Sequence, residues 1–313
     1  MLVSLLSGLL AAVHCVAAEP VEAAEPSRSL AYVLEPGRAR AHTVALELDT
    51  RFAVRTGSEE VVRQTSTALS FQVWTLGLRR KSAEATVVEL VVRDFRLGLL
   101  TRTGASVVEA TMDETGVTLR REGEKPRRVP WANVPRGRGG EVGELIGRPM
   151  VCTVDRRGSA VTVDRRMGPW SRVLDSLDLT PLILPLVPLP AMDVEPGLGW
   201  TVTNACTVQL SRPWGEVKLE TRTTVSLVGF ERQGDVEVAR LAVASTAAPV
   251  EERPRFRYEL SIEGEVLVGL DGAVVGGEAN VTVVGSAVIV DSHYELAGTG
   301  TLRFGPAGEA AAE

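Results

Sequence analysis

The chain has 313 residues, of which 44% are hydrophobic and 24% are charged, and its formal net charge is -6. These proportions are typical of globular proteins and exclude wholesale disorder. The mild acidity argues against nucleic acid or an anionic membrane as a partner, because both favour a basic surface. A chain of this length accommodates one large β domain or two ordinary ones.

Residues 1–18 are typical of a secretory signal peptide. Leu2 to Ala12 form an apolar stretch that is too short to span a bilayer as a stable helix. Val16 and Ala18 fit the small-residue rule for cleavage before Glu19. The alternative is that the segment is retained as an N-terminal anchor. We therefore expect an exported protein, periplasmic or extracellular, and no later segment has the apolar length of a transmembrane helix.

Two further features concern the ends of the chain. Cys15 raises the alternative of a lipoprotein, but the bulky His14 beside it is wrong for a lipobox, so acylation is not expected. Residues 19–28 are rich in Pro, Ala and Glu and predict a disordered linker, and residues 306–313 predict a disordered tail.

Period-two alternation of apolar and polar residues dominates the region between these ends. One buried and one wetted face per strand is typical of antiparallel sheets. The strands are long, which predicts a strongly twisted or curved sheet. The clearest inward-facing series is Phe256, Tyr258, Leu260, Ile262, Val266, Val268 and Leu270.

Turn signals fall where such strands need them. Pro36-Gly37, Arg157-Gly158 and Asp271-Gly272 each carry a glycine suited to a tight turn. At Val238-Ala239 the apolar positions shift from even to odd residue numbers, which predicts a β-bulge at that point. Gly197 and Gly199 precede Trp200, which starts an inward-facing series, so we expect Trp200 to be a mostly buried anchor.

One stretch departs from the alternation. Residues 168–180 have apolar residues at helical spacing and predict one amphipathic helix. Residues 181–192 contain four prolines, which exclude a helix and fit an extended apolar connector. The fold class is therefore mainly β, with long curved antiparallel sheets or a half-barrel, within residues 29–305. The helix and connector, 168–192, separate two halves at about 29–165 and 194–305.

The connector carries too many apolar side chains for a free loop in water. It either packs on the sheet and fills the core, or it forms the lid or wall of an apolar cavity or a membrane-touching loop. The residues that would line such a lid are Trp170, Leu174, Leu177, Leu182, Leu184, Leu186 and Leu189.

Signal removal leaves two cysteines, Cys152 and Cys206, both on the apolar face of strand-like segments. In an exported chain they either form one disulfide across the core or remain two buried free thiols. A catalytic thiol would need a basic, partly exposed setting, which these segments do not offer.

No signature of catalysis or of a metal or cofactor site is present, since the chain lacks the serine-hydrolase elbow, the HExxH and CxxC motifs and the phosphate-binding loop. His42 has the parity of a core or strand-end residue. Asp291, His293 and Glu295 share one strand face, where they form either a solvated surface or, alternatively, a metal site. We expect the solvated surface and a non-enzymatic protein without cofactors.

Several short motifs occur in a familiar order: Leu145-Ile146-Gly147, Asp155-Arg156-Arg157-Gly158, the series from Val194 to Trp200, and Leu227-Val228-Gly229-Phe230. In this order the chain resembles an uncharacterised family of secreted bacterial all-β proteins, classed as a domain of unknown function. The resemblance covers most of residues 29–305 and implies no catalytic residues. At the level of the fold, the expected curved sheet with a helix and connector is distantly similar to LolA-type half-barrel lipoprotein carriers.

Three functions follow as hypotheses. The first is a non-enzymatic cell-envelope module that binds an envelope protein or has a scaffolding role. The second is a periplasmic carrier of an apolar ligand such as a lipid, with 168–192 as its lid. The third is a hydrolase, for which the sequence offers no motif.

Overall fold

The computed structural model describes residues 28–134, 143, 146–158, 160–163, 187–209, 216–251 and 255–306. Within these ranges the side chains of 160–163, 204–209 and 216 are not described. The expected signal peptide, the helix at 168–180 and the connector up to residue 186 lie outside the described residues.

The described part of the chain is mainly antiparallel β structure, as predicted, with one short 3₁₀ helix, Trp131–Asn133. No α-helix lies whole within the described residues. The strands are β1 (Arg28–Leu30), β2 (Ala39–Thr56), β3 (Glu59–Ser82), β4 (Ala85–Thr103), β5 (Ser106–Asp113), β6 (Gly116–Arg121), β7 (Arg127–Pro130), β8 (Met150–Asp155), β9 (Ala160–Val163), β10 (Met192–Val194), β11 (Gly199–Gln209), β12 (Glu216–Gln233), β13 (Val236–Pro249), β14 (Phe256–Gly269), β15 (Val274–Ile289) and β16 (Ser292–Pro306).

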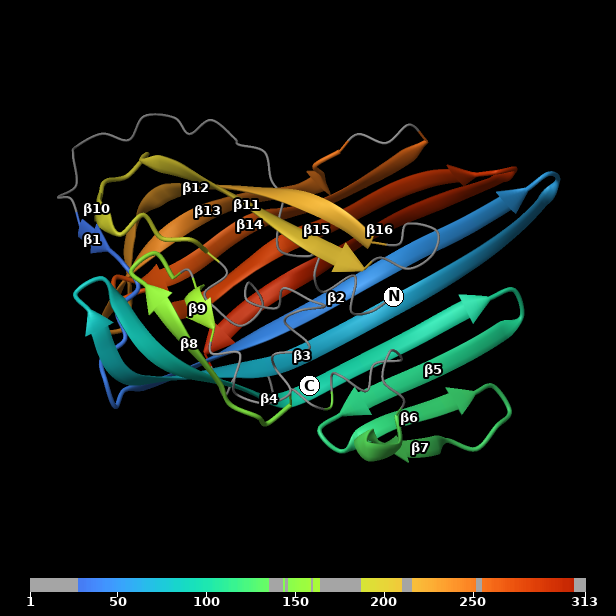
Figure 1. The fold of residues 1–313 in the computed structure, drawn as a ribbon, viewed down its shortest axis with the longest axis horizontal. Helices are drawn as coiled ribbons and strands as arrows, with labels where there is room; N and C mark the ends of the chain where they lie inside the picture. The colour runs from blue at the N-terminus through green and yellow to red at the C-terminus, as the bar shows by residue number, and fades with distance from the viewer. Residues whose placement is uncertain are drawn as a thin grey trace.

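One 14-stranded sheet contains every strand except the β1–β10 pair (Figure 1). Its order is β11-β12-β13-β14-β15-β16-β2-β3-β4-β5-β6-β7, and β8 pairs with β4 and β9 beside this path. The last strand, β16, pairs with β2 along the whole of its length. The two expected halves therefore meet through the two ends of the chain and form a single open sheet.

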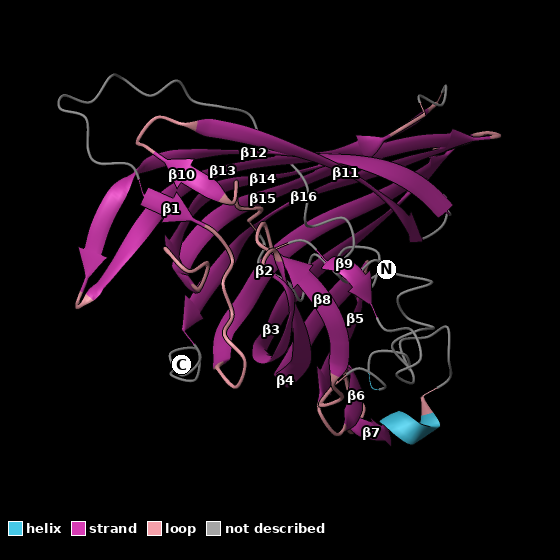
Figure 2. Ribbon diagram, turned by 60° about the vertical axis from the view of Figure 1, so that its left-hand side comes forward, coloured by secondary structure: helices cyan, strands magenta, loops and turns pink. Residues whose placement is uncertain are grey.

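The sheet is folded into two walls (Figure 2). Strands β11–β16 form one wall, β2–β7 descend from it, and β8 and β9 lie in the concavity between them. The inward side chains of both walls belong to one apolar core. No helix in the described part of the chain is both long enough and apolar enough to cross a membrane.

Glycines permit the close strand approaches that this curvature requires. A Cβ atom at Gly300 of β16 would lie 2.0 Å from the carbonyl oxygen of Glu47 in β2. A Cβ at Gly264 of β14 would lie 2.1 Å from the carbonyl oxygen of Glu278 in β15. Only glycine is compatible with such distances, so these positions allow adjacent long strands to coil tightly.

The three predicted turns are confirmed, and Gly37, Gly158 and Gly272 all have positive φ angles of 78° to 84°. The predicted bulge is wrong in position. Strand β13 pairs with β14 without a shift, and the irregularity lies in β12 between Leu227 and Gly229, which face Leu241 and Arg240. The alternation of apolar and polar residues along β13 breaks where two neighbouring residues, Val238 and Ala239, are both fully buried. Val236, nearer the start of the strand, is exposed.

Two predicted boundaries also shift slightly. Arg28, expected to end the disordered linker, is the first residue of β1, where it pairs with Val194. Pro306, expected to begin the tail, is the last residue of β16 and is in register with His42. Both residues are held by backbone pairing that a compositional argument does not detect.

Candidate binding face

The concave face of the sheet carries apolar side chains that form the core of the described chain. It is built by simple alternation, because every second residue of each long strand points to the same side. Its side chains are fully or nearly buried along the middle of the strands. They include Val44, Leu46, Leu48, Leu69, Phe71, Val73, Tyr258, Leu260, Ile262, Val281 and Val283.

We call one end of this concave face the closed end, because residues 30–34 and 187–190 cross it. The Tyr32 N–H donates to the carbonyl of Arg156 at the β8–β9 turn (2.7 Å), and the Val33 N–H donates to the carbonyl of Asp271 at the β14–β15 turn (2.9 Å). The crossing segment thereby joins the turn of the β8–β9 hairpin to a turn of the β11–β16 wall. Leu30 and Leu34, the first and last residues of this segment, are themselves fully buried.

Arg40 fastens this crossing segment to the sheet. Its guanidinium donates to the Val33 carbonyl and to the Asp271 carbonyl, and it forms an ion pair with the Asp271 carboxylate. The same guanidinium lies 5.8 Å from the centre of the Tyr32 ring. Burial raises the pKa of Tyr32 to about 12, so its phenol stays neutral at all physiological pH values.

The end of the apolar connector forms the second part of the closure. Val187 and Leu189 are 1% exposed, and the Leu189 N–H donates to the Arg157 carbonyl (3.0 Å). Leu189 therefore packs in the core rather than facing solvent. Of the residues proposed for a lid, it alone lies within the described part of the chain; Trp170, Leu174, Leu177, Leu182, Leu184 and Leu186 lie outside it.

Trp200 at the start of β11 holds the connector in place. Its Nε1–H donates to the Pro188 carbonyl (2.7 Å), and its ring packs against the core while remaining half-buried. It is an anchor, as predicted, although it is less buried than the alternation alone suggested. The partner carbonyl lies on a neighbouring segment, which no strand pattern within 199–209 could have identified.

At the opposite end, which we call the open end, the apolar lining is less covered. Phe52 and Tyr294 are half-buried neighbours whose ring centres lie 6.3 Å apart, and Phe256 is half-buried on the same face. Val61 and Val290 near the hairpin turns are 57% and 82% exposed. The sequence analysis did not single out these residues, although Phe256 was placed in the inward-facing series of its strand.

Hydroxyl groups interrupt the apolar lining near the middle of the sheet. The Thr50 hydroxyl donates to the Thr65 carbonyl (3.2 Å), and the hydroxyls of Thr65 and Thr101 lie 3.3 Å apart. The Thr67 hydroxyl is buried and has no hydrogen-bond partner. A buried hydroxyl without a hydrogen-bond partner is energetically unfavourable.

His42 occupies the concave face near the closed end and its Nε2 atom is likewise buried without a hydrogen-bond partner. Burial lowers the pKa of His42 to about 4, because the imidazolium form would lose its hydration. The imidazole is therefore neutral at pH 7. The expectation that it is a core or strand-end residue agrees with this setting.

The two cysteines are not equally described. Cys152 in β8 is 2% exposed and its thiol is free; burial raises its pKa to about 12, which makes the thiolate inaccessible at neutral pH. Cys206 is in register with Leu219 within β11, but its side chain lies outside the described residues.

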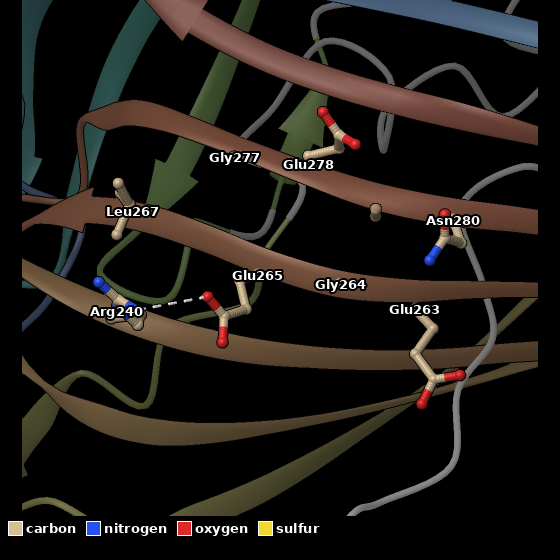
Figure 3. Close-up of a pocket in the computed structure, with 9 residues that line it drawn as sticks. Arg240, Glu263, Gly264, Glu265, Leu267, Gly277, Glu278 and Asn280 are labelled. Carbon is tan, nitrogen blue, oxygen red and sulfur yellow. Dashed lines mark ion pairs between the residues drawn. The ribbon is translucent and has the colours of Figure 1, made fainter.

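A shallow depression of about 490 Å³ lies on the convex face over β13, β14 and β15 (Figure 3). Arg240 pairs there with Glu231 and with Glu265, the latter at 3.7 Å, and the hydrogen bond with Glu231 raises the pKa of Arg240. Glu278 pairs with Arg303 at 3.0 Å. The depression is thus lined by a ladder of exposed ion pairs, which is a typical solvated sheet surface.

Asp291, His293 and Glu295 are all exposed at the start of β16 or just before it. Within the described ranges, no three His, Cys, Asp or Glu side chains lie close enough to hold a metal ion.

Comparison with known proteins finds no matching protein-family model and no matching curated protein. The resemblance to secreted bacterial β proteins and to LolA-type carriers therefore remains a prediction from the sequence.

Proposed function

We propose that this protein is an exported, non-enzymatic binding module of the cell envelope, and that its binding site is the open end of the concave face. The observation that supports this is the difference in cover along one continuous apolar surface. The concave side chains of the middle are buried, whereas Phe52, Phe256 and Tyr294 at the open end are half-buried and border the exposed Val61 and Val290.

The chemistry of this surface selects an apolar partner. Aromatic rings supply large contact areas, and their burial by a ligand is worth roughly 1.5–3 kcal/mol for each fully covered side chain. Charged neighbours such as Glu60 and Arg55 pair with each other on the convex side of the same hairpin at 3.5 Å. The partner that fits is an apolar segment of an envelope protein or the apolar part of a smaller ligand.

A second candidate is a carrier of a lipid or similar amphiphile. The orphaned Thr67 hydroxyl supports this candidate, because a ligand reaching the middle of the concave face would place a polar group against it. Native mass spectrometry of the purified protein tests the carrier, with co-purified lipid as the supporting result. Thr67→Val would then weaken lipid retention without disrupting the fold.

Binding of a fluorescent apolar probe tests the proposed site directly. Phe52→Ala should weaken probe binding about tenfold, since the lost aromatic contact amounts to about 1.4 kcal/mol or more. Trp74→Ala is the matched control, because Trp74 is a partly exposed aromatic residue on the convex face, 4.9 Å from the Arg93 guanidinium. Equal loss in both variants, or no probe binding by the native protein, would contradict an apolar site at the open end.

A further inference from the structure

The two strands that end the main path of the large sheet, β7 and β11, are built very differently, while β9 beside this path is a further edge of only 4 residues. At one edge, β7 has four residues, RRVP, of which two are arginines and one is proline. At the other edge, β11 has 11 residues, GWTVTNACTVQ, with no charged residue and no proline. Among the described residues, β11 is hydrogen-bonded only to β12.

The difference matters because an edge strand carries a row of unpaired N–H and C=O groups. Natural sheets protect such edges with short strands, charges, proline or bulges, and β7 combines three of these devices. Strand β11 pairs with β12 in unbroken register from Gly199 to Gln209 and has none of them. At about 3.4 Å per residue, it offers roughly 37 Å of regular edge.

We infer that β11 pairs with β11 of a second copy of this chain, so that two sheets join into one across a two-fold axis. A symmetric pair needs only one self-complementary strand. Pairing of β11 with β7 of another copy would instead continue without closing and would form fibres. The arginines and proline of β7 oppose that alternative, so a protected β7 and an unprotected β11 together favour a closed dimer.

The sequence of β11 suits antiparallel self-pairing. If the two strands overlap fully, Asn204 lies on the two-fold axis, Thr203 faces position 205 and Trp200 faces position 208. No like charges meet in this register, or in any shifted one, because the strand has no charges. Its threonines and valines also favour extended structure.

Thr203→Lys tests the dimer. Thr203 is exposed and its position is next to the axis, so the two lysines would be diagonal neighbours at roughly 7–8 Å and would repel each other. Light scattering after size exclusion should give a dimer for the native protein and a monomer for this variant. Thr299→Lys is the matched control, since Thr299 is an exposed threonine in the central strand β16, opposite Asp49, and it should leave the dimer unchanged.

Hydrogen exchange provides the second measurement. The amides of β11 that point away from β12 should exchange slowly at high protein concentration and faster on dilution, whereas the amides of β16 should not depend on concentration. A native protein that is monomeric at all concentrations would overturn the inference. So would a dimer that Thr203→Lys leaves intact while its thermal stability is normal.

Discussion

The closed and open ends of the concave face are formed by the same long strands. They differ in how far other described segments cover the apolar side chains. At the closed end, residues 30–34 and 187–190 cross between the walls and bury Leu34 and Leu189 almost completely. At the open end the β2–β3 and β15–β16 hairpins close in two-residue turns, and Val61 and Val290 remain exposed. The comparison indicates that, among the described residues, buried packing is concentrated at the closed end, so substitutions at the two ends should differ in their effect on stability.

The largest expected effect on stability comes from removing a buried side chain at the closed end. Leu189→Ala should lower the free energy of unfolding by about 2–5 kcal/mol, because Leu189, in one of the two crossing segments, is fully buried beside Gly272 of the β14–β15 turn. Val61→Ala is the paired substitution at the open end and should change it by less than about 0.5 kcal/mol. Urea unfolding of both variants measures the contrast. Similar losses in the two variants would show that the two ends do not differ in stability.

A pH dependence of comparable size should come from His42. Its folded pKa is about 4 and its ordinary value is 6.5, so between these values the unfolded chain binds more protons than the folded protein. The stability contributed by the neutral imidazole is complete above pH 6.5 and is lost as the pH falls towards 4, by about 3 kcal/mol in all.

Unfolding experiments across this pH window measure the effect. His42→Leu should flatten the dependence between pH 6.5 and 4, because a leucine at this position has no proton to gain. If the variant and the native protein lose stability equally over the window, the dependence belongs to other groups and His42 is not buried as a neutral residue.

Much of this architecture could be predicted because it depends on local periodicity. Alternation identified the inward series of β14, and glycine identified the turns at Gly37, Gly158 and Gly272. The order of the strands could not be predicted, since the pairing of β16 with β2 joins residues some 250 positions apart. For the same reason the bulge was assigned to β13, when its partner strand β12 carries the extra residue.

The candidate site was harder to predict than the fold. The sequence left two alternatives for the connector, packing on the sheet or forming a lid, and in its described part Leu189 packs in the core. The half-buried Phe52 and Tyr294 have the same alternation as the fully buried residues of their strands. What distinguishes them is that no segment among the described residues crosses their end of the sheet, which is a property of the tertiary structure.

The smallest expected effect concerns the hydrogen bond by which Trp200 holds the connector. Trp200→Phe retains an aromatic ring but removes the Nε1–H donor, which leaves the Pro188 carbonyl without this partner. We expect the free energy of unfolding to fall by about 1 kcal/mol, the usual net value of one hydrogen bond. Trp74→Phe provides the control, because it removes the same donor from an exposed bond to Gln72, where water replaces it, and the change should be close to zero. Thermal unfolding of the two variants side by side makes the comparison, and a larger loss for Trp74→Phe would argue against the role of Trp200 in closing this end of the sheet.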